Sequence, residues 1–213
     1  MVRKTAARRP PPRPADSAPL HERTRRTILD HAARLLRAHG YASTSLRDIA
    51  TATGMKAGSI YYHFDSKEAL AETVMVQGIA LVEERVRSAI AAVPEGTDPL
   101  VVIKAAMTAH MQALHESGDY ASANIRCYSH APDDMKKRLR KVRATYDDLW
   151  GDLIEAAARA DRLAPDIDMK ALRYALIGMM NWTLEWRRPA DDSPDALAGQ
   201  LYRVAFEGAA RDE

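Results

Sequence analysis

The sequence has very little cysteine and no long hydrophobic run, and each scarcity excludes a class of protein. Cys127 is the single cysteine among 213 residues, so an intramolecular disulfide framework is excluded and a reducing cytoplasm is the expected compartment. No apolar stretch approaches the ~18 residues that a membrane-spanning helix needs, so we expect no membrane association. The first residues combine arginine and proline without an apolar segment, and we expect no secretory signal there.

Strand patterns and common catalytic motifs are also missing. β-branched residues are sparse and no clear period-2 alternation occurs, which predicts an all-α fold. The sequence has no Gly-x-Ser-x-Gly elbow, phosphate-binding loop or His-Glu-x-x-His helix. Cys127 and His130 lack a third, orienting group, and His110 and His115 are five residues apart and do not share a helix face. We therefore predict no catalytic residue, no metal site and no cofactor, and hence no enzyme.

Charge is distributed unevenly, although the formal net charge is only +2. Residues 1–67 hold 13 Lys and Arg against 5 Asp and Glu, whereas the remainder holds 18 against 24. A basic segment attracts phosphate, which favours a nucleic-acid partner for the N-terminal part. Residues 1–20 are rich in proline and arginine, and we expect a disordered arm that either follows DNA phosphates or is a solvated tail.

Residues 44–67 have the pattern of two short helices joined by a tight turn. Ser45 with Asp48 three residues later resembles a capping box, and Gly54 tolerates the positive φ that a turn requires. One buried face of the first helix is predicted from four residues at helical spacing: Leu46, Ile49, Ala50 and Thr53.

The second helix of this pair has two unlike faces. Ile60 and Phe64 share an inward face, whereas Gly58, Ser59 and Tyr62 point the other way. The outward face is small, polar and aromatic and carries no acid, which suits a sugar-phosphate surface. The pair is therefore predicted to be a helix-turn-helix that reads DNA.

Helical periodicity continues along the rest of the chain. Beside the helix-turn-helix we expect helices over residues 22–39, 67–93, 98–116, 121–130, 133–160, 168–187 and 193–208. Gly40 and Pro189 are the predicted stops, and Ser66 and Asp168 are predicted caps. The expected domains are a disordered basic arm over 1–20, a helix-turn-helix DNA-binding domain over 21–67, and a larger ligand-binding and dimerisation domain over 68–213.

The turn, core and phosphate-facing positions of residues 22–70 fit one known pattern together. The matching residues are Gly40-Tyr41, Thr44-Ser45, Ile49-Ala50, Gly54, Ile60-Tyr61-Tyr62-His63-Phe64, Lys67-Glu68 and Leu70. With these residues the chain resembles the TetR/AcrR family of one-component transcriptional regulators. Lys56 departs from the family pattern, which usually has a helix-capping Ser or Thr there, so the base preference is left open.

The resemblance implies a division of labour on the DNA-binding surface. It implies that phosphates are held by Thr44, Arg47, Tyr61, His63 and Lys67, and that base edges are approached by Lys56, Ala57, Gly58, Ser59 and Tyr62. Lys67 stands at a helix N-terminus, where amide donors and a cation both favour an anion. Core packing is the alternative role for Tyr61.

A second resemblance lies near the C-terminal end. The segment Met180-Asn181-Trp182-Thr183-Leu184-Glu185-Trp186-Arg187-Arg188-Pro189 and the later helix that opens at Ser193-Pro194 are similar to a TetR subgroup that senses acyl-CoA or related CoA thioesters of catabolic pathways. The run Arg188-Pro189-Ala190-Asp191-Asp192 departs from the aromatic-Arg-Pro-acid-Gly run of that subgroup. The resemblance implies a CoA thioester effector; a drug-responsive repressor of an efflux pump is the alternative.

Inward-facing methionine and aromatic side chains in the larger domain predict a cavity for a hydrophobic small molecule. The apolar lining candidates are Met107, Met111, Leu114, Tyr146, Trp150, Met179 and Trp182. The polar candidates, which would fix an acyl carbonyl or a phosphate, are His110, Arg126, Tyr128 and Asn181. Ordinary core packing is the alternative for His110 and for each apolar candidate.

Small residues on the last two helices predict a homodimer built on a four-helix bundle. The candidates are Ala171, Ala175, Gly178 and Trp182 on one helix and Ala198, Leu201, Ala205 and Ala209 on the other. A two-fold dimer would present its reading helices ~34 Å apart, or a multiple of that, to an inverted-repeat operator in double-stranded DNA. The resemblance thus implies a cytoplasmic, ligand-responsive repressor, and a partner-binding helical protein or a helical enzyme is the alternative from another class.

Overall fold

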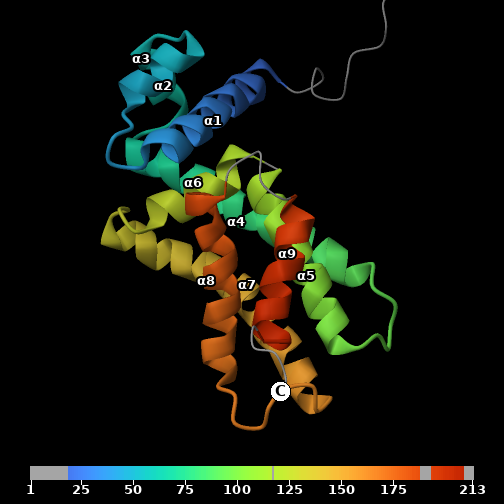
Figure 1. Ribbon diagram of the computed structural model, residues 1–213. Helices are drawn as coiled ribbons and strands as arrows, with labels where there is room; N and C mark the ends of the chain where they lie inside the picture. Colours follow the sequence, from blue (N-terminus) through green and yellow to red (C-terminus); the bar gives the residue numbers. More distant parts are fainter. Residues whose placement is uncertain (1–18, 117, 188–192, 209–213) are drawn as a thin grey trace, which may run out of the picture.

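The computed structural model describes residues 19–116, 118–187 and 193–208, and over these ranges the protein is a bundle of α-helices without a strand (Figure 1). The helices in chain order are α1 (Leu20–His39), α2 (Leu46–Thr53), α3 (Ala57–His63), α4 (Lys67–Ala91), α5 (Pro99–His115), α6 (Asp119–Tyr128), α7 (Asp133–Arg159), α8 (Met169–Trp186) and α9 (Pro194–Phe206). The predicted all-α fold is confirmed. Helix ends predicted from periodicity and caps lie within two residues of the observed ends.

Part of the sequence prediction falls outside the described residues. This applies to the arm up to residue 18, to the segment 188–192 with the predicted stop Pro189, and to Ala209. Within the part of the chain that the structure describes, no helix has the length and apolar character needed to cross a membrane.

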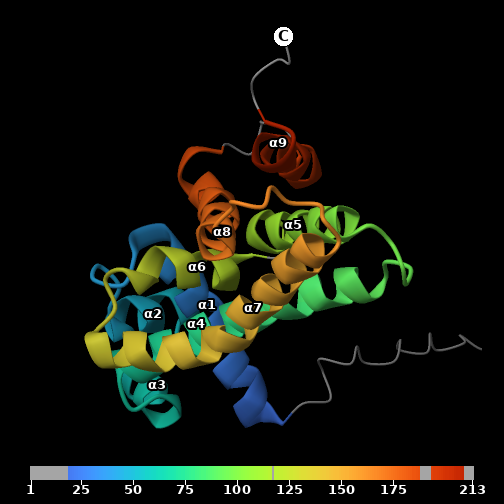
Figure 2. The same cartoon turned by 90° about the horizontal axis from the view of Figure 1, so that it is seen from below.

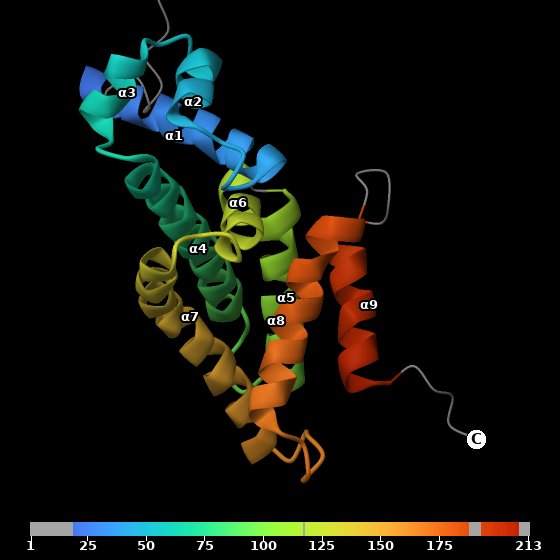
Figure 3. The ribbon, with the colours of Figure 1, turned by 90° about the vertical axis from the view of Figure 1, so that its left-hand side faces the viewer.

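The first three helices pack together through the apolar faces that the sequence predicted. The buried residues of α1 and α2 include Ile28, Ala32, Leu36, Leu46, Ile49 and Ala50. Gly40 follows α1 with a φ of 76°, a conformation that glycine adopts without steric cost. The predicted helix-turn-helix is therefore present, and it forms one end of the molecule (Figure 3).

α4 leaves this end and runs into the larger helical body (Figure 3). Its start is fixed by Ser66, whose hydroxyl accepts the backbone N–H of Ala69 at 3.0 Å, as predicted. Farther along, α4 passes so close to α6 that a side chain at Gly78 would overlap the backbone of Tyr120. α4 therefore links the helix-turn-helix to the larger body and packs tightly there.

The larger body is layered. α7 and α9 lie on opposite sides of the layer that α5 and α8 form, as Figure 2 shows. Its core surrounds the fully buried indole of Trp150, with Ile103, Met107 and Met111 packed in the same cluster.

α6 contributes to both buried clusters of the protein. Ala123 and Cys127 pack in the cluster that contains Ile28 of α1, whereas Ala121 packs with Trp150 in the larger body. A single short helix thus touches the helix-turn-helix end on one side and the larger body on the other.

Candidate nucleic-acid interface and ligand cavity

The turn between α2 and α3 has the geometry that the sequence predicted. The N–H of Asp48 donates to the Ser45 hydroxyl at 3.2 Å, and the N–H of Ser45 donates to the Asp48 carboxylate at 2.8 Å, which completes the capping box. Hydrogen bonds from Ser45 lower the pKa of Asp48, so the carboxylate stays charged. Gly54 supplies the turn with a φ of 68°, and Lys56 precedes α3 without a capping hydrogen bond from its side chain.

α3 presents an exposed face and a buried face. Tyr61 is 57% exposed and Tyr62 is 77% exposed, whereas Ile60 and Phe64 are buried. The other predicted base-reading residues are also exposed: Lys56, Ala57, Gly58 and Ser59. Core packing of Tyr61, the alternative drawn from the sequence, is therefore excluded, and the face offers aromatic, small and basic groups to solvent.

The start of α1 completes this face, which the sequence interpretation missed. The ring centroid of His21 lies 4.5 Å from that of His63 and 5.8 Å from that of Tyr62. Burial, followed by the nearby His21 and Arg25, lowers the pKa of His63. His21 and Arg25 are one helical turn apart on α1, and this spacing is the signal that could have identified them.

The remaining predicted phosphate-binding residues are placed differently from one another. Arg47 is exposed on α2. The Lys67 ammonium lies 4.3 Å from the ring centroid of Tyr41, at the start of α4. Thr44 is only 2% exposed, and its hydroxyl donates to the Gly40 carbonyl at 2.9 Å. The Thr44 side chain therefore closes the loop after α1 and lies off the exposed face, contrary to the role expected for it.

A cavity of about 710 Å³ lies in the larger body, bounded by α4, α5, α6, α7 and α8. Its apolar walls are formed by Ile79, Val82, Leu114, Ala121, Ile125 and Ile177. Exposed residues of α7 and α8, among them Arg140, Asp148 and Tyr174, also line it and mark its opening. The cavity thus combines an apolar interior with a charged and polar rim.

Two buried polar side chains, His110 and Tyr146, and the half-buried Asn181 line this cavity. The Nδ1 atom of His110 lies 2.7 Å from the hydroxyl of Tyr146, and its Nε2 atom lies 3.1 Å from Oδ1 of Asn181. Burial lowers the pKa of His110 to about 4, so the imidazole is neutral at physiological pH. These side chains come from α5, α7 and α8, which meet at the cavity.

Arginine side chains lie at the same cavity and were not selected from the sequence. Arg143 donates to the Asn124 side-chain oxygen at 3.0 Å and stacks over the Tyr128 ring at 3.9 Å. Arg173 donates to the Asp147 carbonyl at 3.1 Å. Burial lowers the pKa of Arg143. The rim therefore supplies guanidinium groups, which suit a phosphate-bearing ligand.

The structure brings together only part of the predicted ligand set. The candidates that line the cavity are His110, Leu114, Tyr128, Tyr146 and Asn181. Met107, Met111 and Trp150 are fully buried in the core beside it, and Met179 is partly buried in the same core. Trp182 is 66% exposed and points away from the core, so its expected lining role is wrong.

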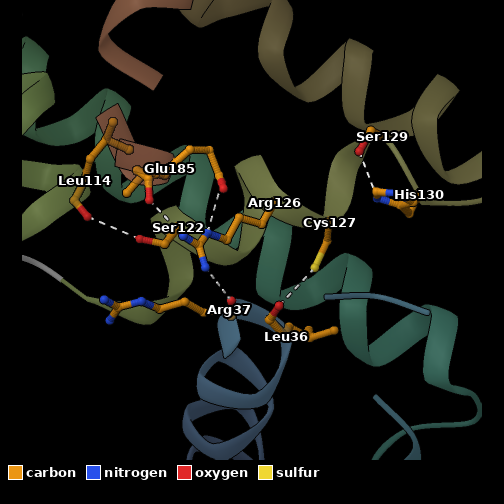
Figure 4. A network of polar contacts seen from close by, with 10 residues as sticks. Leu36, Arg37, Leu114, Ser122, Arg126, Cys127, Ser129, His130 and Glu185 are labelled. Atoms are coloured by element: carbon orange, nitrogen blue, oxygen red, sulfur yellow. Dashed lines mark hydrogen bonds and ion pairs between the residues drawn. The ribbon is translucent and has the colours of Figure 1, made fainter. Parts of the chain in front are cut away.

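Arg126 lies outside the cavity and joins separate helices instead. Its guanidinium donates to the carbonyl of Arg37 at the end of α1 at 3.2 Å and to the carbonyl of Leu184 on α8 at 2.8 Å. Its Nε atom is 3.3 Å from the Glu185 carboxylate. Figure 4 shows this network, with the Cys127 thiol beside it directed at the Leu36 carbonyl. The expected ligand contact of Arg126 is thus replaced by a contact between α1, α6 and α8.

The predicted dimer residues fall on two kinds of surface. Ala171, Ala175 and Gly178 are exposed on α8, on the same side as Trp182. On α9, Ala198 is fully buried, and Leu201 and Ala205 pack partly buried against the core of the same chain. The α8 face is therefore open to a partner, whereas Ala198 is used within the monomer, where α9 packs against α5.

Both parts of the chain match known sequence families. Residues 28–74 match the family model described as "Bacterial regulatory proteins, tetR family", and residues 96–209 match "Tetracyclin repressor-like, C-terminal domain". The HTH-type transcriptional repressor KstR2 of Rhodococcus jostii is 28% identical over 209 residues, which are 93% of this chain and 97% of that protein.

Solved structures have the same architecture. The crystal structure of AibR in complex with isovaleryl coenzyme A and operator DNA is 26% identical, with a TM-score of 0.74 over 85% of this chain and 97% of that chain. The TetR family transcriptional regulator PfmR from Thermus thermophilus is 21% identical, with a TM-score of 0.74 over 86% of this chain and 99% of that chain.

Proposed function

Because the chain belongs to the tetR family of bacterial regulatory proteins, we propose that it is a repressor whose dimer binds an inverted-repeat operator and leaves it when a CoA thioester enters the cavity. The family is one of DNA-binding transcriptional regulators rather than enzymes. Family membership is the starting point; we propose in addition the inverted-repeat operator, the dimer and the chemical class of the effector.

The exposed face of α3 supports the DNA-binding step. Tyr62 offers a ring to thymine methyl groups and a hydroxyl to phosphate, and Gly58 and Ser59 allow the helix to approach base edges closely. Arg47 and Lys56 are exposed and add positive charge to the helix-turn-helix, which attracts phosphate irrespective of sequence.

The open face of α8 supports a dimer. Small residues at Ala171, Ala175 and Gly178 permit close helix packing, and the exposed indole of Trp182 supplies a large apolar contact. A symmetric pair formed through α8 would carry two copies of α3, one for each half of an inverted repeat.

The composition of the cavity is the observation that carries the effector class. Its apolar walls suit an acyl chain, the neutral His110 disfavours a buried charge, and Arg140, Arg143 and Arg173 suit phosphate groups at the rim. AibR, which is similar over most of the chain, was crystallised with isovaleryl coenzyme A and operator DNA. A hydrophobic tail with a polyanionic head is therefore the ligand that fits these features best.

α6 supplies a route from the cavity to the DNA-binding end. Asn124 and Ile125 line the cavity, while Arg126 contacts the end of α1. A ligand that moves α6 would shift α1. It would also shift α4, because α4 packs against α6 at Gly78. A coupling free energy of about 1–3 kcal/mol between the two sites is enough for regulation.

An operator-release experiment tests the proposal. A labelled DNA fragment that the protein has selected from a random-sequence library is titrated with the full chain, and CoA thioesters of increasing acyl length are then added. We expect a CoA thioester to lower the affinity for DNA about 5–150-fold. If a cationic dye releases the protein from the DNA and no CoA thioester does, the effector is not a CoA thioester, and the protein is a drug-responsive repressor.

A further inference from the structure

We propose that Asn181 donates a hydrogen bond to a carbonyl oxygen of the effector, and that His110 and Tyr146 are positioning residues that hold its amide in the donating orientation. The inference rests on the proposed function, since it identifies the group of the effector that this part of the cavity binds. It concerns the interior of the cavity and not the guanidinium groups at its rim.

The orientation of the Asn181 amide, with its oxygen towards His110, assigns the protons in this chain of side chains. The Asn181 oxygen, 3.1 Å from Nε2 of His110, can only accept, so Nε2 carries the proton. Burial keeps the pKa of His110 near 4, so the ring is neutral and Nδ1 has a free lone pair. The Tyr146 hydroxyl, 2.7 Å away, therefore donates to Nδ1. Burial also raises the pKa of Tyr146, so the phenol keeps its proton.

This arrangement leaves the Asn181 amide nitrogen directed to other partners. Among the described residues, no protein group accepts a hydrogen bond from that nitrogen, and Asn181 lines the cavity. Its neighbours in the lining include the aliphatic Leu114 and Ile177, which cannot accept a hydrogen bond. Asn181 is half-buried, and a ligand that fills the cavity would remove water from its amide nitrogen. A donor that loses its water without gaining an acceptor costs about 1–3 kcal/mol, so a ligand that supplies a neutral acceptor is favoured over one that does not.

A neutral carbonyl is the acceptor that this site selects. None of His110, Tyr146 and Asn181 is charged, so these three side chains offer a carboxylate no charged donor to compensate for its loss of water. A CoA thioester provides carbonyl oxygen from two sources: the thioester carbonyl itself and any oxo group in the acyl part. Both have the same hydrogen-bonding chemistry, and suitable probes separate them.

The test compares probes that differ by a carbonyl group. Octanoyl-CoA, S-octyl-CoA, which has a thioether in place of the thioester, and an 8-carbon oxo-acyl-CoA are titrated into the full chain by calorimetry. We expect the wild type to bind a carbonyl-bearing probe at least 10-fold more tightly than S-octyl-CoA. If octanoyl-CoA already binds more tightly than S-octyl-CoA, the thioester carbonyl is the group that Asn181 binds. If only the oxo-acyl-CoA binds more tightly than S-octyl-CoA, the oxo group is.

Variants test the roles of the individual side chains. Asn181→Leu keeps the volume of the side chain and removes the amide. The ratio of the affinity for a carbonyl-bearing probe to that for S-octyl-CoA should therefore fall to about one, while S-octyl-CoA still binds. In Tyr146→Phe the imidazole proton can move to the other nitrogen and the amide can turn its oxygen to the cavity, so the preference should also be lost. His110→Gln retains a donor to the Asn181 oxygen and should restore part of the preference that His110→Leu loses. Met107→Leu, in the core beside the cavity, is the control and should leave the preference unchanged.

The outcomes separate this inference from the function on which it rests. A preference that survives in Asn181→Leu, or a wild type that binds all three probes equally, overturns the inference while the effector class stands. A wild type that binds none of the CoA probes overturns the effector class and the inference together.

Discussion

Gly78 of α4 lies directly against the backbone of Tyr120 of α6, and a methyl group added at Gly78 would overlap the Tyr120 carbonyl. The hydroxyl of the same tyrosine donates to the Asp30 carboxylate on α1 at 2.8 Å. Tyr120 of α6 thus touches α1, which belongs to the DNA-binding end, and α4, which connects that end to the larger body. The position of α6 is therefore tied to that of α1 and α4.

Replacing Gly78 with alanine should separate α4 from α6. The added methyl group has no free space, so we expect a loss of about 1–3 kcal/mol in the free energy of unfolding, measured by urea denaturation. Gly199→Ala is the control, because no atom lies within 4 Å of its added Cβ, and the higher helix propensity of alanine should make that variant as stable or more stable. Equal effects of the two substitutions would contradict the close packing of α4 on α6.

Removing the Arg126 side chain should uncouple the cavity from the DNA-binding end. Its guanidinium joins α1 to α8 through the carbonyls of Arg37 and Leu184. In Arg126→Ala we expect ligand affinity to stay within a few-fold of wild type, while the effect of ligand on DNA affinity falls by at least half of a coupling of about 1–3 kcal/mol. Arg159→Ala, which removes an exposed ion pair within α7, should keep the full effect.

Placing a charge on the open face of α8 should dissociate the dimer. Trp182 is 66% exposed there, and a buried carboxylate without a partner would oppose association of two copies. Trp182→Glu should sediment as a monomer at micromolar concentration and should bind the full operator much more weakly than wild type. Val101→Glu, on an exposed position of α5, is the matched control and should remain dimeric. A dimeric Trp182→Glu would assign dimerisation to another surface.

Two residues of the helix-turn-helix should affect DNA binding in different ways. If Arg47 contacts a phosphate as proposed, Arg47→Ala should weaken binding to all sequences alike and lower the slope of log affinity against log salt by about 0.9. Tyr62→Ala should also change which base is preferred at the contacted position, by about 1–3 kcal/mol. Competition with a panel of single-base operator variants at two salt concentrations distinguishes the two effects. A Tyr62→Ala protein with unchanged preference would remove Tyr62 from base reading.

The buried His110 makes stability depend on pH. Its pKa of about 4 in the folded protein lies below the ordinary value of 6.5, so between these values the unfolded chain binds a proton that the folded chain does not. Stability should therefore fall as the pH decreases from 6.5 towards 4, by about 2 kcal/mol for this group between pH 7 and pH 5.

Urea unfolding at pH 7, 6 and 5 measures this dependence. His110→Gln removes the titrating group, so its stability should fall less over the same range. His115, whose pKa burial lowers to about 4, and His63, whose pKa burial also lowers, remain in the variant and contribute to the residual slope. Identical slopes for wild type and variant would mean that His110 is not buried in the neutral form.

The helices could be predicted from the sequence because their signals are local. Ser45, Ser66 and Asp168 cap the helices that they precede, and Gly40 and Gly54 take positive φ at the ends of α1 and α2. The outward direction of Tyr62 follows from the helical spacing of Ile60 and Phe64, which fix the opposite face. α6 was predicted two residues late, because its start at Asp119 follows Gly118 without a side-chain cap.

The cavity was predicted less well because α5 is apolar on several sides. Helical spacing shows that Met107 and Met111 are buried, but it does not show whether core or cavity lies beside them. Arg143 and Arg173 were missed because a basic residue on a long helix is usually solvated, and only the packing of α7 against α8 brings them to the rim. Trp182 was misassigned because helical spacing does not show which apolar side of α8 stays outside the core of its own chain.

The most direct test of the account is a three-component titration of full-length protein, operator DNA and CoA thioester, followed by fluorescence anisotropy of the DNA. We predict that the dimer binds the inverted repeat in a salt-dependent manner and that a CoA thioester releases it, while the same ligand leaves an Arg126→Ala dimer largely on the DNA. Saturation of the cavity with ligand, observed calorimetrically, with no change in the affinity for operator DNA would contradict it.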